Sequence, residues 1–75
     1  MRLKEDEMEI FENIKEGVSD TYQLAIFTKL EEARIKNIME KLERIGLIKI
    51  IKKFDEFYNE EYWNAELIKD LGDFK

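Results

Sequence analysis

The chain of 75 residues contains no cysteine and no histidine. It therefore cannot form a disulfide, a thiolate or imidazole metal site, or a cysteine nucleophile, and it lacks the usual general base for catalysis near neutral pH. Neighbouring carboxylates occur within residues 5–9 and at residues 60–61. Such pairs are more typical of helix starts and solvated loops than of a cation site. We expect no enzyme, no cofactor and no metal site.

Proline is also absent, and no apolar run is long enough to span a membrane. The first seven residues are too acidic for a signal peptide, so we expect a cytoplasmic protein without a membrane partner. A chain of this length has room for one core, and residues 1–75 are expected to form a single domain. Its composition, 44% hydrophobic and 41% charged, is that of a folded domain.

Apolar residues recur at helical spacing in three segments, and the three glycines (17, 46 and 72) stand where periodic segments stop. The pattern predicts helices over about residues 4–16, 21–30 and 32–45, with Ser19 or Asp20 capping the second. In the second helix we expect burial of Leu24, Ala25, Phe27 or Thr28, and Leu30. In the third, one narrow stripe should face the core: Ile35, Ile38, Leu42 and Ile45.

After Gly46 the pattern changes from helical to strand-like. Residues 47–54 are rich in β-branched side chains, residues 55–61 are polar, and residues 62–68 can return as a second strand, which predicts a hairpin over about 47–68. One face of the returning strand carries Trp63, Ala65 and Leu67. Phe54 and Trp63 are expected to cover the core. The fold class is therefore mainly α with a small β-hairpin.

The order and spacing of these residues follow a known pattern: Leu24-Ala25, Leu30, Ile35, Ile38, Leu42, Gly46 and Leu47-Ile48. Over about residues 8–68 the chain resembles a winged helix-turn-helix domain of the MarR or ArsR-like regulator group. The resemblance implies a three-helix winged helix-turn-helix and a small, sequence-specific double-stranded DNA-binding protein, a transcriptional regulator with its third helix in the major groove. A symmetric dimer would suit palindromic half-sites.

The chain departs from that family pattern in two places. The turn between the second and third helices reads Lys29-Leu30-Glu31-Glu32, without the usual glycine and Ser or Thr cap. The family's wing often carries Arg or Lys at its tip, whereas this wing carries carboxylates: Asp55, Glu56, Glu60 and Glu61.

The net charge of −5 is unevenly distributed along the chain. Residues 21–54 hold 8 basic and 4 acidic side chains, a net charge of +4, while residues 1–20 carry −4 and residues 55–75 carry −5. The basic excess thus lies in the helix-turn-helix and the first wing strand, the part that would face a duplex.

If the third helix enters a major groove, Arg34 and Asn37 near its start are the candidate base contacts, because Arg suits guanine and Asn suits adenine. Lys36, Lys41 and Arg44 would hold phosphates. The start of the second helix, with Thr21 and Gln23, would offer backbone N–H groups to another phosphate. On the wing strand Lys53, with Lys49 and Lys52, either extends the basic stripe or protects a strand edge.

Two observations support a different hypothesis. Glu32, Lys36, Glu40 and Arg44 are spaced four apart with alternating sign, as on a solvated helix face whose charges pair with one another. Phe57 and Tyr58 stand at the acidic wing tip with no evident core to enter, as aromatic residues at protein interfaces do. The alternative is a winged-helix module that docks a protein partner or forms a homodimer through this wing, with little or no DNA binding.

Overall fold

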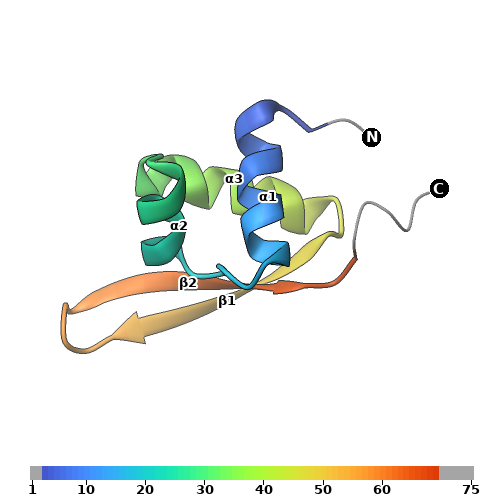
Figure 1. Ribbon diagram of the computed structural model, residues 1–75. Coiled ribbons are helices and arrows are strands. Elements are labelled where there is room, and N and C mark those ends of the chain that lie inside the picture. The colour runs from blue at the N-terminus through green and yellow to red at the C-terminus, as the bar shows by residue number, and fades with distance from the viewer. Residues whose placement is uncertain (1–2, 70–75) are drawn as a thin grey trace.

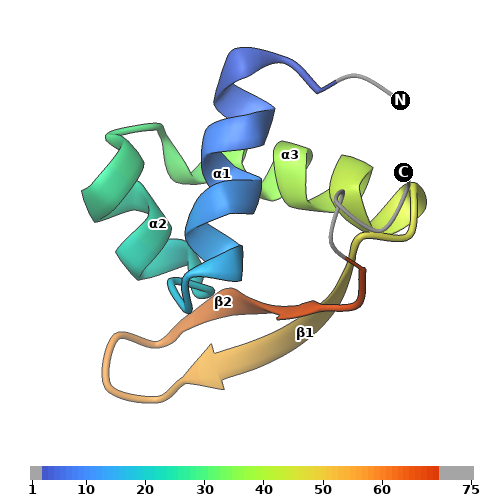
Figure 2. The same cartoon turned by 45° about the vertical axis from the view of Figure 1, so that its right-hand side comes forward.

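The computed structural model describes residues 3–69. It contains three helices, α1 (Glu5–Lys15), α2 (Thr21–Thr28) and α3 (Glu32–Arg44), followed by strands β1 (Ile48–Asp55) and β2 (Glu60–Leu67). The helices pack together on one side of the antiparallel hairpin (Figures 1 and 2). The expected fold class is confirmed, and the layout is compatible with a winged helix. Gly72 and the first two residues, on which the sequence expectations also bear, lie outside the described residues.

Two glycines end helices as the pattern predicted. Gly17 has φ of 101°, its N–H donates to the Ile14 carbonyl at 3.1 Å, and the Val18 N–H donates to the Asn13 carbonyl at 2.9 Å. The corresponding two hydrogen bonds end α3. The Gly46 N–H donates to the Glu43 carbonyl and the Leu47 N–H to the Leu42 carbonyl, both at 3.0 Å, and Gly46 has φ of 86°. These bonds satisfy carbonyls that the last helical turn leaves without a partner, and glycine enters the left-handed region without steric cost.

Helix α2 begins where expected and ends two residues early. Of the two proposed caps, Asp20 is the one used, because its Oδ1 accepts from the Gln23 N–H at 2.8 Å. The helix ends at Thr28 because Lys29 has φ of 61°, in the left-handed region. Leu30 then turns back and packs, half-buried, against the core.

The core joins all three helices to the hairpin. On α3 the expected stripe is buried at Ile35, Ile38 and Leu42, Met39 joins it, and Ile45 is half-buried. The other buried side chains come from every remaining element and from the residue after Gly46: Ile10, Phe11, Ile14, Leu24, Leu47, Ile48, Trp63 and Ala65.

Three aromatic or aliphatic residues expected in or facing the core are exposed instead. Phe27 is 62% exposed, and its alternative Thr28 is half-buried. Phe54 is 60% exposed because the hairpin extends past α2, beyond the layer of helices (Figure 1). Leu67, at the end of β2, is 41% exposed, whereas Trp63 and Ala65 on the same strand face are buried as predicted.

The hairpin is fastened to the helices along one edge. Its strands pair from Ile48 with Leu67 to Asp55 with Glu60, so the turn is shorter than expected and occupies residues 56–59. The free edge of β2 meets the segment before α2, where the Ala65 N–H donates to the Ser19 carbonyl at 2.9 Å. No helix within residues 3–69 has the length and apolar character needed to cross a bilayer.

Candidate nucleic-acid interface

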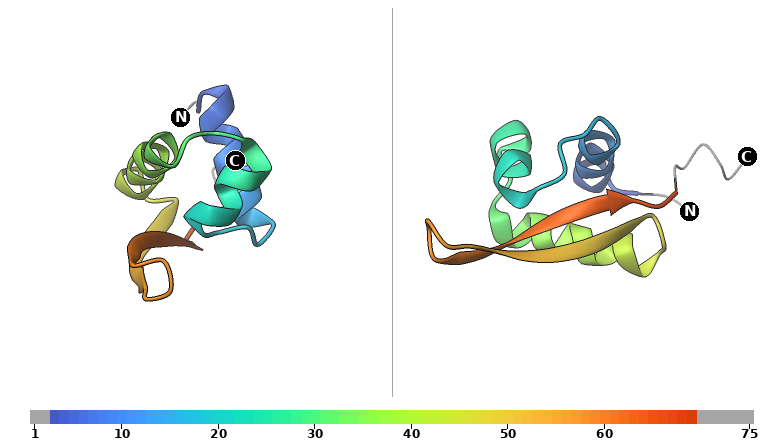
Figure 3. Two further views of the ribbon diagram at one scale, coloured as in Figure 1. Left: turned by 90° about the vertical axis from the view of Figure 1, so that its left-hand side faces the viewer. Right: turned by 90° about the horizontal axis from the view of Figure 1, so that it is seen from below.

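Helix α3 runs alongside the hairpin (Figure 3). Its four sides face the core, α1, the hairpin and solvent. At about 100° per residue, its buried stripe faces the core, Arg34 and Lys41 share a flank toward α1, and Lys36 lies on the flank toward the hairpin. The side opposite the core is exposed, and we call it the outward face of α3: Ala33, Asn37, Glu40 and Arg44.

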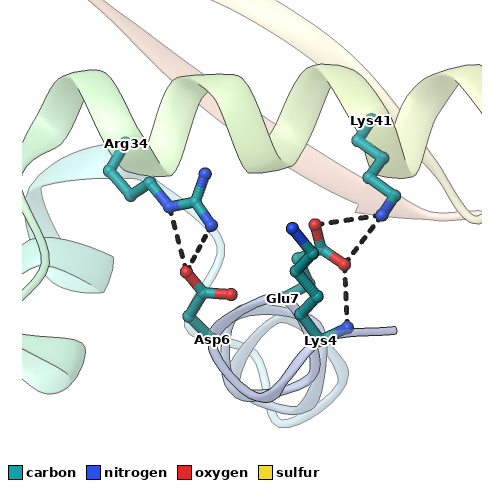
Figure 4. A network of polar contacts seen from close by, with 5 residues as sticks. All are labelled: Lys4, Asp6, Glu7, Arg34 and Lys41. Carbon is teal, nitrogen blue, oxygen red and sulfur yellow. Dashed lines mark hydrogen bonds and ion pairs between the residues drawn. The ribbon is translucent and has the colours of Figure 1, made fainter. Parts of the chain in front are cut away.

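The flank toward α1 is held by two ion pairs (Figure 4). The Arg34 guanidinium donates to Asp6 Oδ2 from Nε at 2.9 Å and from a terminal nitrogen at 2.5 Å. Lys41 Nζ donates to both carboxylate oxygens of Glu7, at 2.9 and 3.0 Å. Glu7 is only 4% exposed. Both cations therefore fasten α1 to α3.

These contacts explain the ionisation of the two carboxylates. The hydrogen bond from Arg34 holds the pKa of Asp6 below its usual range. The Lys4 backbone N–H, 2.9 Å from Glu7 Oε1, and then the Lys41 ammonium hold the pKa of Glu7 below its usual range. Arg34 was expected at a base edge and Lys41 at a phosphate. Each instead pairs with a carboxylate of α1 in the free chain, and the expected DNA contacts of Arg34 and Lys41 stay predictions.

The flank toward the hairpin carries the α3–wing junction, which consists of Lys36, Lys52 and Trp63. Lys36 Nζ lies 5.2 Å and Lys52 Nζ 5.0 Å from the centroid of the Trp63 ring. Trp63 is 8% exposed. One lysine comes from α3 and the other from β1, so the ring brings together cations from the third helix and the wing, an arrangement that each cation–π contact stabilises. Glu32 pairs with Lys36 at 3.1 Å.

The outward face holds two predicted contacts, Asn37 and Arg44, both exposed. The ladder of alternating charges forms only at its first step, the Glu32–Lys36 pair, and Glu40 and Arg44 enter no ion pair within residues 3–69. The outward face is therefore open to a partner. Ala33, next to Asn37 on this face, gave no signal in the sequence because a single alanine fits any side of a helix.

The start of α2 does not form the expected phosphate site. Thr21 is fully buried, and its Oγ1 accepts from the Trp63 N–H at 3.3 Å, so the prediction that it reaches DNA is wrong. Gln23 is exposed, but its backbone N–H already donates to Asp20. That carboxylate also places a negative charge where a phosphate would have to lie.

The wing carries its predicted residues on separate faces. Lys53 is exposed but points away from the α3–wing junction, because successive strand residues alternate and its register partner is Tyr62. Lys52 is the wing lysine on the junction side. The sequence could not distinguish the two lysines until the face of β1 that meets the helices was known.

The wing tip holds a chain of aromatic rings, which we call the wing-tip cluster: Tyr22, Phe57, Tyr58 and Tyr62. The Tyr22 ring lies 5.2 Å from Tyr62 and 6.2 Å from Tyr58, and Phe57 meets Tyr58 edge to face at 4.9 Å. Phe57 is 86% and Tyr58 64% exposed. Burial raises the pKa of Tyr22, and nearby carboxylates, first that of Glu60, raise it further.

Two of the four wing carboxylates have local structural contacts. Asp55 Oδ1 accepts from the backbone N–H groups of Phe57 and Tyr58 at 2.9 and 3.3 Å, which holds the turn. Glu61 Oε1 accepts from the Trp63 indole N–H at 3.2 Å. Asp55 and Glu61 therefore help to hold the structure of the wing.

Three helices followed by a two-stranded antiparallel hairpin that packs along the third are compatible with a winged-helix layout. No family model, curated protein or solved structure matches it. Within residues 3–69 there is no pocket and no group of three or more potential metal ligands.

Proposed function

We propose that this protein binds double-stranded DNA, with the outward face of α3 in the major groove and the wing against the backbone, and that it acts in the cytoplasm as a transcriptional regulator. The observation that carries the proposal is the α3–wing junction. There the ammonium groups of Lys36 and Lys52 lie 5.2 and 5.0 Å from the centroid of the buried Trp63 ring, so one ring has a cation of the helix and a cation of the wing beside it. A duplex lying along α3 would meet both lysines at once.

The ion pairs with α1 reduce the expected number of phosphate contacts. Arg34 and Lys41 pair with carboxylates of α1, whereas Lys36 pairs only with Glu32 of its own helix, a surface i,i+4 contact that contributes little to stability. We therefore keep Lys36, Lys52 and Arg44 as the phosphate contacts. Three contacts predict a slope of about −3 for the logarithm of the binding constant against the logarithm of salt concentration. Raising salt from about 50 to about 200 mM should then weaken binding roughly 40-fold.

A fluorescence anisotropy titration with a random duplex at those two salt concentrations tests the proposal. Lys52→Ala should reduce the slope by about 1, because it removes one phosphate contact. Lys49→Ala is the matched control, since Lys49 is an exposed lysine of the same strand on its other face. Failure to bind duplex at about 50 mM salt, or equal effects of the two variants with helical content unchanged, would contradict the proposal.

The second candidate function is protein docking through the wing-tip cluster, and its specific observation is the exposure of Phe57 and Tyr58 in a connected group of rings. Self-association through this tip would bring carboxylates of two chains together. It should therefore strengthen with added salt, which screens like charges, whereas DNA binding weakens.

Sedimentation at low and high salt separates these functions. Self-association through the tip predicts a mass that rises with protein concentration and salt, and that falls to one chain in Phe57→Ser. Phe54→Ser is the matched control, because Phe54 is also an exposed phenylalanine of the wing but makes none of the ring contacts of the cluster. A single-chain mass under all conditions would contradict docking between copies.

A further inference from the structure

The polar groups left free on the outward face of α3 define a base preference. We infer that this face reads adenine–thymine base pairs, with Asn37 contacting adenine and Ala33 packing against the thymine methyl group. The inference rests on the DNA binding proposed above and names the sequences to which that binding is directed.

The first step is the loss of the usual guanine contact. Arginine reads guanine through its O6 and N7 acceptors, and Arg34 is the arginine near the start of α3. Two of its five N–H donors, one on Nε and one on a terminal nitrogen, are directed at Asp6 Oδ2, so the guanidinium is turned toward α1 and away from the outward face. Arg44 is the last residue of α3, about 10 Å along the helix axis from Asn37, and lies where the chain leaves the helix. Guanine therefore lacks its usual partner beside Asn37.

The second step concerns the groups that remain. The Asn37 carboxamide both donates and accepts, which matches the N7 and N6 positions of adenine. The Glu40 carboxylate only accepts, so it fits an amino group of adenine or cytosine and repels the two acceptors of guanine. Neither side chain enters an ion pair or a hydrogen bond within the described residues, so both are free to turn toward a base.

The spacing of Ala33 and Asn37 along α3 matches the spacing of base pairs. Ala33 lies one turn before Asn37, about 6 Å along the helix axis, which is close to two base-pair steps of about 3.4 Å. Its methyl group is exposed and is the kind of apolar contact that distinguishes thymine in the major groove. Ala33 and Asn37 together therefore address a short stretch of A·T pairs.

Selection from a pool of randomised duplexes at about 50 mM salt tests the inference. The wild-type protein should enrich a short A·T motif and bind it roughly 10- to 100-fold more tightly than a G·C duplex of equal length. Asn37→Ala should lose most of this preference. Arg44→Gln is the matched contrast, because removing a phosphate contact on the same face should weaken both duplexes alike and keep the motif.

Base analogues assign the contacts to atoms. Placing 7-deazaadenine in the enriched motif removes N7 and should weaken wild-type binding about 10-fold while leaving Asn37→Ala unchanged. Replacing thymine by uracil should weaken binding in wild type and not in Ala33→Gly. Asp6→Ala releases Arg34 and should raise affinity for the G·C duplex.

The outcomes are distinguishable. No binding to any duplex contradicts the proposed function itself. Equal binding to A·T and G·C duplexes leaves the proposed function intact and overturns the inference. A preference that survives Asn37→Ala and 7-deazaadenine also overturns it, because DNA shape then supplies the selectivity. If Asp6→Ala binds the G·C duplex with unchanged affinity, then Asp6 is not what keeps Arg34 from contacting guanine, and that part of the inference is wrong.

Discussion

The buried carboxylate of Glu7 on α1 binds the ammonium group of Lys41 on α3. It accepts the Lys4 backbone N–H and both hydrogen bonds of the Lys41 ammonium while it is 4% exposed. A buried charge needs such partners because water no longer solvates it. The charge of Lys41 is therefore committed to the interior contact between α1 and α3.

Replacing Lys41 by methionine should lower the free energy of unfolding by about 2–3 kcal/mol, because it leaves the Glu7 carboxylate buried without its cation. Urea denaturation measures the difference. Lys49→Met is the matched control, an exposed lysine whose loss should change the unfolding free energy by less than about 0.5 kcal/mol. Equal effects of the two substitutions would contradict the structural role of Lys41.

The pH dependence of stability should carry the same signature. The pKa of Glu7 is lowered in the folded protein, first by the Lys4 N–H and then by Lys41. Its contribution to stability is therefore present above the ordinary carboxyl pKa of about 4.3 and is lost as pH falls through the folded value. Between about pH 5 and pH 3, Glu7→Gln should lose less stability in urea titrations than wild type. Glu9→Gln, at an exposed position, is the control. If the stability of Glu7→Gln fell with pH as steeply as that of Glu9→Gln, the prediction would be wrong.

For single residues of α3, the sequence predicted which side chains lie off the core but not which neighbouring element they face. Arg34, Lys41 and Asn37 all lie off the buried stripe of α3, as the helical period predicted. That period cannot tell which flank α1 covers, because the answer depends on packing between distant segments. Thr21 was misplaced for a related reason. Its hydroxyl accepts the Trp63 N–H of β2, and no local pattern shows that this strand lies beside the start of α2.

At the scale of elements, local signals were enough to place all three helices and the hairpin. Gly17 and Gly46 end α1 and α3 because the left-handed conformation they adopt is one that other residues rarely take. The end of α2 was missed because Lys29, not glycine, takes this conformation, and a lysine carries no such signal. The turn between α2 and α3 therefore passes through the left-handed region at a lysine.

Lys29→Gly should stabilise the protein by about 0.5–1 kcal/mol, since glycine avoids the steric cost of the left-handed region and returns only part of the gain through a more flexible unfolded chain. Lys29→Val should destabilise it by about 1–2 kcal/mol, because a β-branched side chain tolerates positive φ poorly. Thermal denaturation of both variants gives the comparison. A valine variant as stable as the glycine variant would show that α2 does not depend on this conformation.

At the scale of the whole molecule, the net charge of −5 gives little guidance to function because several carboxylates have structural roles. Asp20 caps α2, Glu43 accepts the Ile50 N–H at 2.8 Å, and Asp55 holds the wing turn. The regional charges locate the basic excess in residues 21–54. They could not show that Asp6 and Glu7 of α1 pair with two of the cations of α3.

The same contacts make the wing and the helices one cooperative unit. Trp63, the only tryptophan, lies in the core that all three helices share, and its backbone N–H bonds to Thr21 at the start of α2. Unfolding followed by Trp63 fluorescence should therefore coincide with the loss of helical circular dichroism. The shared transition should have an enthalpy of about 50 kcal/mol near 60 °C, as expected for this length. If fluorescence changed at a lower temperature than the helical signal, the wing would be melting independently. Lys36 and Lys52 would then no longer be held over one ring, and the geometry on which the proposed DNA interface depends would exist only below that first transition.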